Sequence, residues 1–201
     1  MRTVDTDVRE LDRRAVLASM EIVSLVQVSD LDRPTPCAEW TLGELLAHMT
    51  AQHHGFVAAA SGEGGDLARW QVTPGVSDPV SAYTLATARV VSAFAAVGVL
   101  DRDFSLPELS TQLTFPGRQA IGFHFLDYVV HAWDVTRTLD VPLDLDDDVL
   151  ATALAMAQDV PDGNLRLRPG AVFGPGVPVA VDASTLDTTV AMLGRSPSWP
   201  D

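Results

Sequence analysis

The segment 124–137, which reads His-Phe-Leu-Asp-Tyr-Val-Val-His-Ala-Trp-Asp-Val-Thr-Arg, constrains the fold of this chain more than any other. Most of its residues are apolar, as in a helix that is buried on several sides. The polar exceptions are His124, Asp127, His131 and Asp134. Residues three, four and seven apart lie on one face of a helix, so these side chains form a single stripe. Burying imidazoles and carboxylates is costly unless they pair or bind a metal, and the segment therefore predicts a core helix that carries a polar site.

The composition limits the class of protein. A chain of 201 residues, 47% of them hydrophobic, is long enough for a single domain with a substantial core. The net charge of −14 argues against a nucleic-acid partner, because phosphate binding needs clustered cations. Cys37 is the only cysteine, which excludes an internal disulfide and fits a reducing compartment. We find no signal peptide and no uncharged apolar run near the roughly 18 residues of a membrane span, so we expect a cytoplasmic protein without a membrane partner.

The helical spacing of apolar residues predicts four long helices and a short extension. The long helices are expected at 5–29, 42–60, 79–97 and 118–139, and the extension is expected to hold helices at 148–159 and 184–193. Leu25 of the first helix and Leu85 of the third are expected on buried faces. A short extended piece is expected at 113–115, before a Pro-Gly pair.

Two helix starts carry clear capping signals. Thr41 and Glu44 fit a capping box, in which each side chain bonds the backbone N–H of the other. Asp78 fits an N-cap and is followed by Pro79, which suits the first helical position. The loop between these helices, 62–77, is long enough for a crossover connection in a helical bundle.

The polar stripe suggests a metal site when His48 of the second predicted helix is added to Asp127 and His131. Two imidazoles and a carboxylate suit a divalent ion such as zinc, and three protein ligands leave one position open, as in catalytic sites. A hydrogen-bonded pair in a packed core is the competing interpretation, because many helices contain Asp-x-x-x-His as an ion pair. On spacing alone, His48 fits a core histidine that bonds a backbone carbonyl better than a ligand.

Three further residues of this segment have more than one interpretation each. Asp134 could orient a ligand imidazole through its second ring N–H, or pair with Arg137 at the surface. Arg137 could bind a substrate carboxylate or cap the helix C-terminus. His124 lies two turns before His131, where it would support the site from outside the ligand shell, contact substrate, or face solvent.

The remaining candidates are assigned more ordinary roles. His53 and His54 are expected at the surface, and Trp40 and Trp133 are expected to pack in the core. Cys37 precedes a helix start, where a thiol can be activated, but the sequence offers it no obvious catalytic partner.

The chain resembles a known family in three motifs. These are Pro36-Cys37-x-x-Trp40-Thr41-x-x-x-Leu45-x-x-His48-Met49, then Asp127-x-x-x-His131-Ala132-Trp133-Asp134, and the tail Val172-Phe173-Gly174-Pro175-Gly176-Val177-Pro178-Val179 with Leu193-Gly194-Arg195. Together they are similar to the DinB-like superfamily, and more narrowly to an actinobacterial metal-binding branch. That branch is related to the N-terminal domain of mycothiol-dependent maleylpyruvate isomerase.

The resemblance implies an all-α fold within a single domain, 1–201. Residues 1–140 would form a DinB-like four-helix bundle with a crossover between its second and third helices, and 141–201 would form a C-terminal extension. The family holds its metal between the second and fourth helices with His, Glu and His, which correspond here to His48, Asp127 and His131. Asp replaces Glu in this chain, so the carboxylate reaches less far by one methylene.

The resemblance also implies a function. We expect a divalent-metal protein, with zinc before nickel or another ion, in which a small thiol such as mycothiol attacks an electrophilic substrate in S-transfer or isomerisation. The isomerase has a separate C-terminal domain, and the region after residue 140 is shorter, so the same isomerase activity does not follow. Two alternatives remain: a non-catalytic metal-binding bundle that acts as a sensor or interaction module, as a homodimer, and a zinc-dependent hydrolase.

Overall fold

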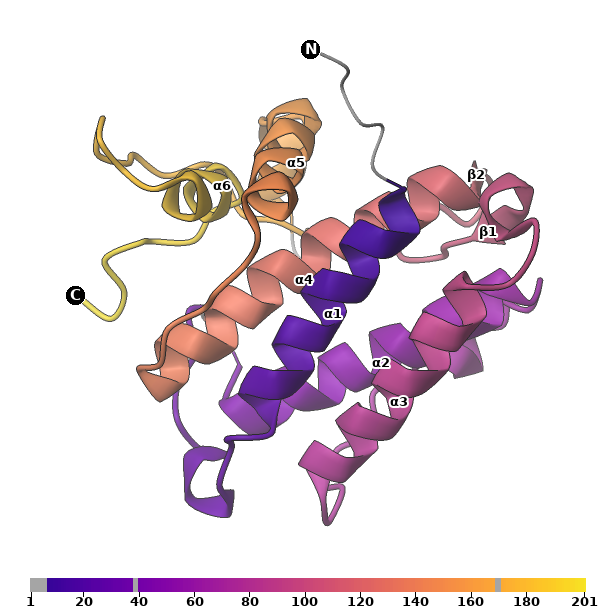
Figure 1. The fold of residues 1–201 in the computed structure, drawn as a ribbon, viewed down its shortest axis with the longest axis horizontal. Helices are drawn as coiled ribbons and strands as arrows, with labels where there is room; N and C mark the ends of the chain where they lie inside the picture. The colour runs from indigo at the N-terminus through magenta and orange to yellow at the C-terminus, as the bar shows by residue number, and fades with distance from the viewer. Residues whose placement is uncertain (1–6, 38–39, 169–170) are drawn as a thin grey trace.

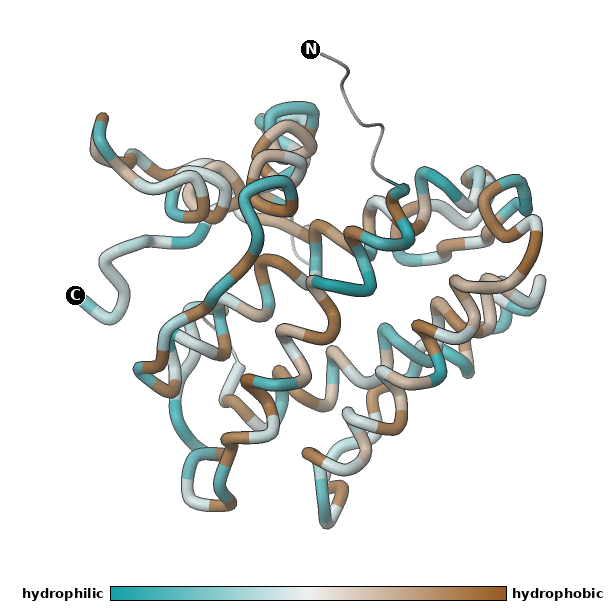
Figure 2. The backbone as a smooth tube through the Cα atoms, in the orientation of Figure 1, coloured by the Kyte–Doolittle hydropathy of each residue, from teal (hydrophilic) through white to brown (hydrophobic). Residues whose placement is uncertain are grey.

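Four long helices form a bundle in which the first and fourth run in one direction and the second and third in the opposite one (Figure 1). A computed structural model describes residues 7–37, 40–168 and 171–201. The bundle helices are α1 (Val8–Val23), α2 (Leu42–Ala60), α3 (Pro79–Phe94) and α4 (Gly117–Leu139). Helix α1 packs mainly on α4, and α2 packs on α3, with further contacts between α1 and α3 and between α2 and α4. The apolar residues recur along each helix between hydrophilic ones, as Figure 2 shows, which is the pattern of amphipathic bundle helices.

The capping signals place the starts of α2 and α3 as predicted. The Thr41 hydroxyl accepts from the backbone N–H of Glu44, and the Glu44 carboxylate accepts from the backbone N–H of Thr41. The Asp78 side chain accepts from the backbone N–H of Ser81. These bonds satisfy backbone donors that a helix N-terminus leaves open. The predicted bounds 42–60 for α2 are confirmed.

Helix α1 is shorter than predicted. It ends at Val23, whereas the predicted helix runs to residue 29, and residues 5 and 6 of that prediction lie outside the described part of the chain. The chain turns after Val23 and forms a single 3-10 turn, η1 (Val28–Asp30). This turn buries Val26 and leaves Leu25 51% exposed, so the expectation that Leu25 is buried was wrong.

The buried face of α3 also differs from the expected one. Leu85 is 62% exposed, while Tyr83 and Thr87 are buried. The face is rotated because both hydroxyls find partners inside the core. Tyr83 bonds Ser19 at 2.6 Å, and Thr87 bonds a ring nitrogen of His53 at 3.2 Å.

A small hairpin joins α3 to α4. After the 3-10 turn η3 (Val99–Asp101), strand β1 (Asp103–Ser105) pairs antiparallel with β2 (Thr114–Pro116). The predicted extended piece at 113–115 is therefore confirmed, one residue later. The long connection between α2 and α3 contains the 3-10 turn η2 (Leu67–Trp70), whose Trp70 ring covers Gly55 of α2 so closely that a Cβ there would lie 2.1 Å from the ring.

The C-terminal extension shares a core with the bundle. It contains α5 (Asp147–Asp159), the 3-10 turn η4 (Asn164–Leu167) and α6 (Thr185–Met192). Its buried side chains pack with α1 and α4 in one cluster: Leu11, Ala15, Phe125, Leu126, Val129, Val130, Val149, Ala153, Ala157 and Leu193. In the described residues, no helix has both the length and the apolar character that a membrane crossing requires.

Candidate metal centre

The structure brings His48 of α2 together with Asp127 and His131 of α4. Each residue offers one ligand atom, and these atoms all lie within 4.8 Å of one another. Asp127 and His131 are one helical turn apart, which places Oδ1 of Asp127 3.4 Å from Nε2 of His131. The three residues form a group that could bind a metal ion.

The spacing of these atoms fits a small divalent ion. Ligands at about 2.0–2.1 Å from a tetrahedral centre lie roughly 3.4 Å apart, which the Asp127–His131 pair already matches. The group as a whole spreads over up to 4.8 Å, so the three ligand atoms would move closer together on binding one ion. A histidine, an aspartate and a second histidine are also the nitrogen and oxygen donors that zinc accepts.

One ring nitrogen of His131 faces the group and the other faces a carboxylate. Nδ1 donates to Oδ2 of Asp134 at 3.0 Å, which leaves Nε2 on the side of Asp127. Asp134 is completely buried, and Arg195 donates to both of its oxygens, from Nε to Oδ1 at 2.9 Å and from Nη2 to Oδ2 at 3.0 Å. Asp134 therefore orients the imidazole, as one of its two interpretations predicted, and the alternative surface pair with Arg137 was wrong.

The pKa values of the two imidazoles are shifted in opposite directions. Burial, followed by the nearby charge of His131, lowers the pKa of His48 to about 4, so this ring is neutral at pH 7 and keeps a lone pair for a ligand. Burial alone would lower the pKa of His131 as well. The carboxylates of Asp127 and Asp134 outweigh that effect and raise its pKa, so this position attracts positive charge.

Trp40 and Cys37, from the segment before α2, contact residues of the site. The Trp40 ring lies 4.5 Å from the His48 ring, measured between centroids, so it packs on a candidate ligand as well as on the core. The Sγ atom of Cys37 accepts a hydrogen bond from Nη2 of Arg195 at 3.3 Å. Trp133 is buried, as predicted.

A second carboxylate lies near the group and was not predicted. Glu108, in the loop between β1 and β2, accepts at both oxygens from Nε2 of Gln52, at 3.0 and 2.9 Å. Gln52 is one turn after His48 on α2. Partial burial and the charge of Asp127 raise the pKa of Glu108. The sequence could have indicated Gln52, because it lies on the same face of α2 as His48. No sequence feature near Glu108 indicates that it lies close to the site.

His124 and His53 belong to a different polar cluster inside the bundle. His124 is completely buried, and its Nδ1 donates to Oδ1 of Asp12 at 2.6 Å. Its Nε2 lies 3.1 Å from Nδ1 of His53, which in turn reaches Thr87. Both ring nitrogens of His124 are thus used away from the metal group, so the expected role in supporting the site or contacting substrate is not found.

The expectation of surface positions for two histidines is half correct. His53 is completely buried, so its predicted exposure was wrong, whereas His54 is exposed as predicted. The physical reason lies in the other helices. His53 stacks on Tyr128 of α4 at a centroid distance of 4.2 Å, and its ring nitrogens are paired with side chains of α3 and α4.

Arg137 neither caps α4 nor reaches the metal group. Its Nη2 donates to the backbone carbonyls of Pro197 at 3.1 Å and Trp199 at 2.6 Å. Its guanidinium also lies 5.7 Å from the centroid of the Trp133 ring. Arg137 therefore fastens the end of the chain to α4.

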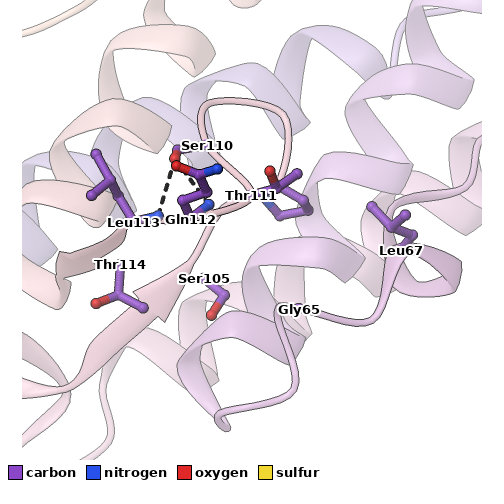
Figure 3. A pocket seen from close by; sticks show the side chains of 9 residues that line it. Gly65, Leu67, Ser105, Ser110, Thr111, Gln112, Leu113 and Thr114 are labelled. Carbon is purple, nitrogen blue, oxygen red and sulfur yellow. Dashed lines mark hydrogen bonds between the residues drawn. The ribbon is translucent and has the colours of Figure 1, made fainter.

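A separate small cavity lies at the tip of the hairpin (Figure 3). Its volume is about 210 Å³, and its walls come from the chain just before η2 and its first residue, from the facing ends of the two strands, and from the loop between them: Gly65, Leu67, Ser105, Pro107, Ser110, Thr111, Gln112, Leu113 and Thr114. The Ser110 hydroxyl accepts from the backbone N–H groups of Gln112 and Leu113, which gives the loop its shape. None of the candidate ligands lines this cavity, and it is smaller than most ligand pockets.

The fold and the site together define a class, the DinB-like helical bundles that carry a candidate metal group between the second and fourth helices. Within that class the chain belongs to the family of the mycothiol maleylpyruvate isomerase N-terminal domain, whose model matches residues 13–136. The match spans all four bundle helices from within α1 to near the end of α4, and it includes each of the three candidate ligands.

Similar proteins support the family and the fold. Two uncharacterized proteins of Mycobacterium tuberculosis, MT0763 of strain CDC 1551 and Rv0738 of strain H37Rv, are each 29% identical over 190 residues, covering 92% of this chain and 95% of theirs. The crystal structure of mycothiol-dependent maleylpyruvate isomerase superposes with a TM-score of 0.54 at 18% identity, and a histidine-to-alanine mutant of it with 0.58 at 16%. Each superposition covers 78% of this chain and 72% of the isomerase chain, and at these identities shows the fold alone.

Proposed function

We propose that this protein is a metal-dependent enzyme that uses a low-molecular-weight thiol of the mycothiol class in S-transfer or isomerisation of an electrophilic substrate. The observation that carries the proposal is the convergence of His48, Asp127 and His131 from two helices. Membership of a family named for a mycothiol-dependent enzyme supports the choice of thiol. Zinc is the ion that this donor set suits best.

The residues of the chain would divide the work as follows. His48, neutral at pH 7, and Asp127 would bind the ion directly, and His131 would bind it through Nε2 while Asp134 holds Nδ1. A divalent ion at this place would supply a Lewis acid that lowers the pKa of a thiol or water in the remaining position. The side chain of Asp127 is 19% accessible, against 5% for His131, so small molecules could reach the ion on the side of Asp127.

Glu108 would act as a proton acceptor close to that approach. Gln52 holds its carboxylate, and a raised pKa brings it nearer to the pH at which a carboxylate accepts and returns a proton efficiently. Its two bonds to one amide nitrogen leave further lone pairs on both oxygens for another donor.

The thiol step has a direct test. Purified protein is loaded with zinc, titrated with mycothiol by calorimetry, and assayed for conjugation of mycothiol to a generic electrophile. We expect saturable thiol binding and conjugation that both depend on zinc. Zinc binding without thiol affinity would refute the proposal and favour the non-catalytic alternative, in which the bundle acts as a sensor or as a dimeric interaction module. Hydrolysis of ester substrates without any thiol requirement would favour the zinc hydrolase.

A further inference from the structure

We propose that the C-terminal segment 193–201 is a functional part of the metal centre, and that Arg195 is a positioning residue that raises the affinity of His131 for a divalent cation. The inference rests on the proposed metal site. It adds a dependence on a segment that follows the last helix of the extension, far in sequence from the candidate ligands.

The contacts form an unbroken series from the segment to the ligand. Arg195 is only 7% exposed, and it holds Asp134 through two hydrogen bonds, one to each carboxylate oxygen. Oδ2 of Asp134 accepts from Arg195 and from Nδ1 of His131, so the position of Arg195 fixes the oxygen that orients the ring. A carboxylate in this place fixes the tautomer of a ligand histidine and makes its other nitrogen a better donor.

The backbone of the segment is shaped to deliver this guanidinium. Gly194 has φ +87°, a left-handed conformation that turns the chain directly after α6. A Cβ at this position would lie 2.7 Å from backbone atoms of Gly174, so only glycine fits. The turn sends the Arg195 side chain into the bundle, where it meets both Asp134 of α4 and Cys37 of the segment before α2.

A second arginine fastens the rest of the segment without touching the site. Arg137 follows Asp134 by one turn on α4 and donates to the carbonyls of Pro197 and Trp199. It is exposed, and its contacts in the described part of the chain are with Pro197, Trp199 and the Trp133 ring rather than with the candidate ligands. Arg137 thus offers a matched control, because its removal frees only the backbone at Pro197 and Trp199, while the Arg195–Asp134 pair that acts on His131 stays intact.

Metal binding at His131 and docking of Arg195 on Asp134 must affect each other. If docking of Arg195 on Asp134 raises metal affinity by some factor, metal binding raises the docking equilibrium of Arg195 by the same factor. A purely structural role of Arg195 predicts neither effect. It predicts only a loss of stability when the buried pair is broken.

The experiment compares the wild type with Arg195→Ala, Arg195→Lys and Arg137→Ala. Zinc affinity is measured by competition with a chromophoric chelator, and the cobalt(II) form is examined by visible spectroscopy. Hydrogen exchange of segment 193–201 is followed with and without zinc. We expect Arg195→Ala to weaken zinc binding by about 10- to 100-fold, Arg195→Lys to recover part of the loss, and Arg137→Ala to remain near wild type. We also expect zinc to slow exchange in the wild-type segment.

Several outcomes would overturn the inference. Zinc affinity of Arg195→Ala equal to wild type, or exchange of the wild-type segment unaffected by zinc, would show that Arg195 is only an anchor. If Arg195→Ala does not fold, the lysine variant and the exchange measurement on wild type still decide the question. Absence of zinc binding in wild type would refute the proposed metal centre itself, whereas normal zinc binding with no coupling would refute the present inference alone.

Discussion

The carboxylate of Asp134 and the guanidinium of Arg195, 61 residues apart, form a two-bond ion pair inside the protein, with Nε–Oδ1 and Nη2–Oδ2 distances of 2.9 and 3.0 Å. Arg195 is the main opposing charge that keeps the pKa of Asp134 low, against the burial that would raise it. The pair links the C-terminal extension to the helix that carries two candidate ligands. The charge of Arg195 also compensates for the burial of the Asp134 carboxylate, which bonds Nδ1 of His131.

Replacing Asp134 tests that link from the side of the helix. We expect Asp134→Asn to weaken zinc binding by about 10- to 100-fold, because the amide no longer fixes the ring of His131 as a charged acceptor does. We also expect a loss of about 3–5 kcal/mol in the free energy of unfolding, since Arg195 stays buried without its partner. Chelator competition and guanidinium chloride unfolding measure the two effects. Unchanged values in both would contradict the assigned geometry.

The carboxylate ligand can be tested by charge and by length. Asp127→Asn removes the charge and is expected to weaken zinc binding at least about tenfold, because an amide oxygen is a poorer ligand than a carboxylate for zinc. Asp127→Glu keeps the charge and is expected to retain binding. The Asp127 side chain is 19% exposed, so there is room for the extra methylene while the carboxylate stays at the site. Isothermal titration with zinc distinguishes them. Equal affinity of the Asn variant and wild type would exclude Asp127 from the ligand set.

The buried polar cluster is expected to contribute strongly to stability. Asp12 of α1 and His124 of α4 are 1% and 0% exposed, and their side chains are 2.6 Å apart. Asp12→Ala leaves Nδ1 of the buried His124 ring without its acceptor. We expect a loss of about 3–5 kcal/mol in the free energy of unfolding, with zinc affinity unchanged, because the cluster is separate from the metal group. A loss of zinc binding in a folded Asp12→Ala variant would show that the two clusters are coupled.

Stability should depend on pH through His53. Burial, reinforced by the neighbouring His124, puts the pKa of His53 well below its usual value in the folded protein. The unfolded chain therefore takes up a proton near pH 6.5 that the folded chain does not, so stability falls as the pH falls below that value, by up to about 1.4 kcal/mol per pH unit. His48 acts in the same direction, with a folded pKa of about 4, while the raised pKa of His131 acts in the opposite one.

Unfolding of the metal-free protein in guanidinium chloride between pH 7.5 and 5.5 measures this dependence. The slope of the unfolding free energy against pH should be smaller in His53→Gln than in wild type, whatever the absolute stability of the variant. Identical slopes would show that His53 can be protonated in the folded state.

The local parts of the fold and site could be predicted from sequence. The capping box of Thr41 and Glu44 fixed the start of α2, and the four-residue spacing of Asp127 and His131 placed them on one face of α4. These signals lie within one helical turn, where chain geometry alone decides which residues meet. His48 was added to this pair from an earlier helix, but its local sequence did not distinguish a ligand from a core histidine, and the resemblance to a known family supported the choice.

The parts that failed depend on contacts between distant segments. His53 has no local signal of burial, because its partners Thr87 and His124 lie on other helices. Arg195 was noticed only as part of a similar tail motif, and nothing near it in sequence indicates Asp134 as its partner. Leu85 lost its expected burial because two hydroxyl groups on α3 found hydrogen-bond partners in the core.

The central claim is that His48, Asp127 and His131 hold one divalent ion. It is tested most directly by the zinc content and zinc affinity of wild type, His48→Ala and His131→Ala, with His54→Ala as the matched control, since His54 lies on the same helix as His48 but is exposed. We predict one zinc per chain in wild type and His54→Ala, and loss of that zinc in folded His48→Ala and His131→Ala. Wild-type protein that binds no zinc, cobalt or nickel, or ligand variants that bind as well as His54→Ala, would contradict the account.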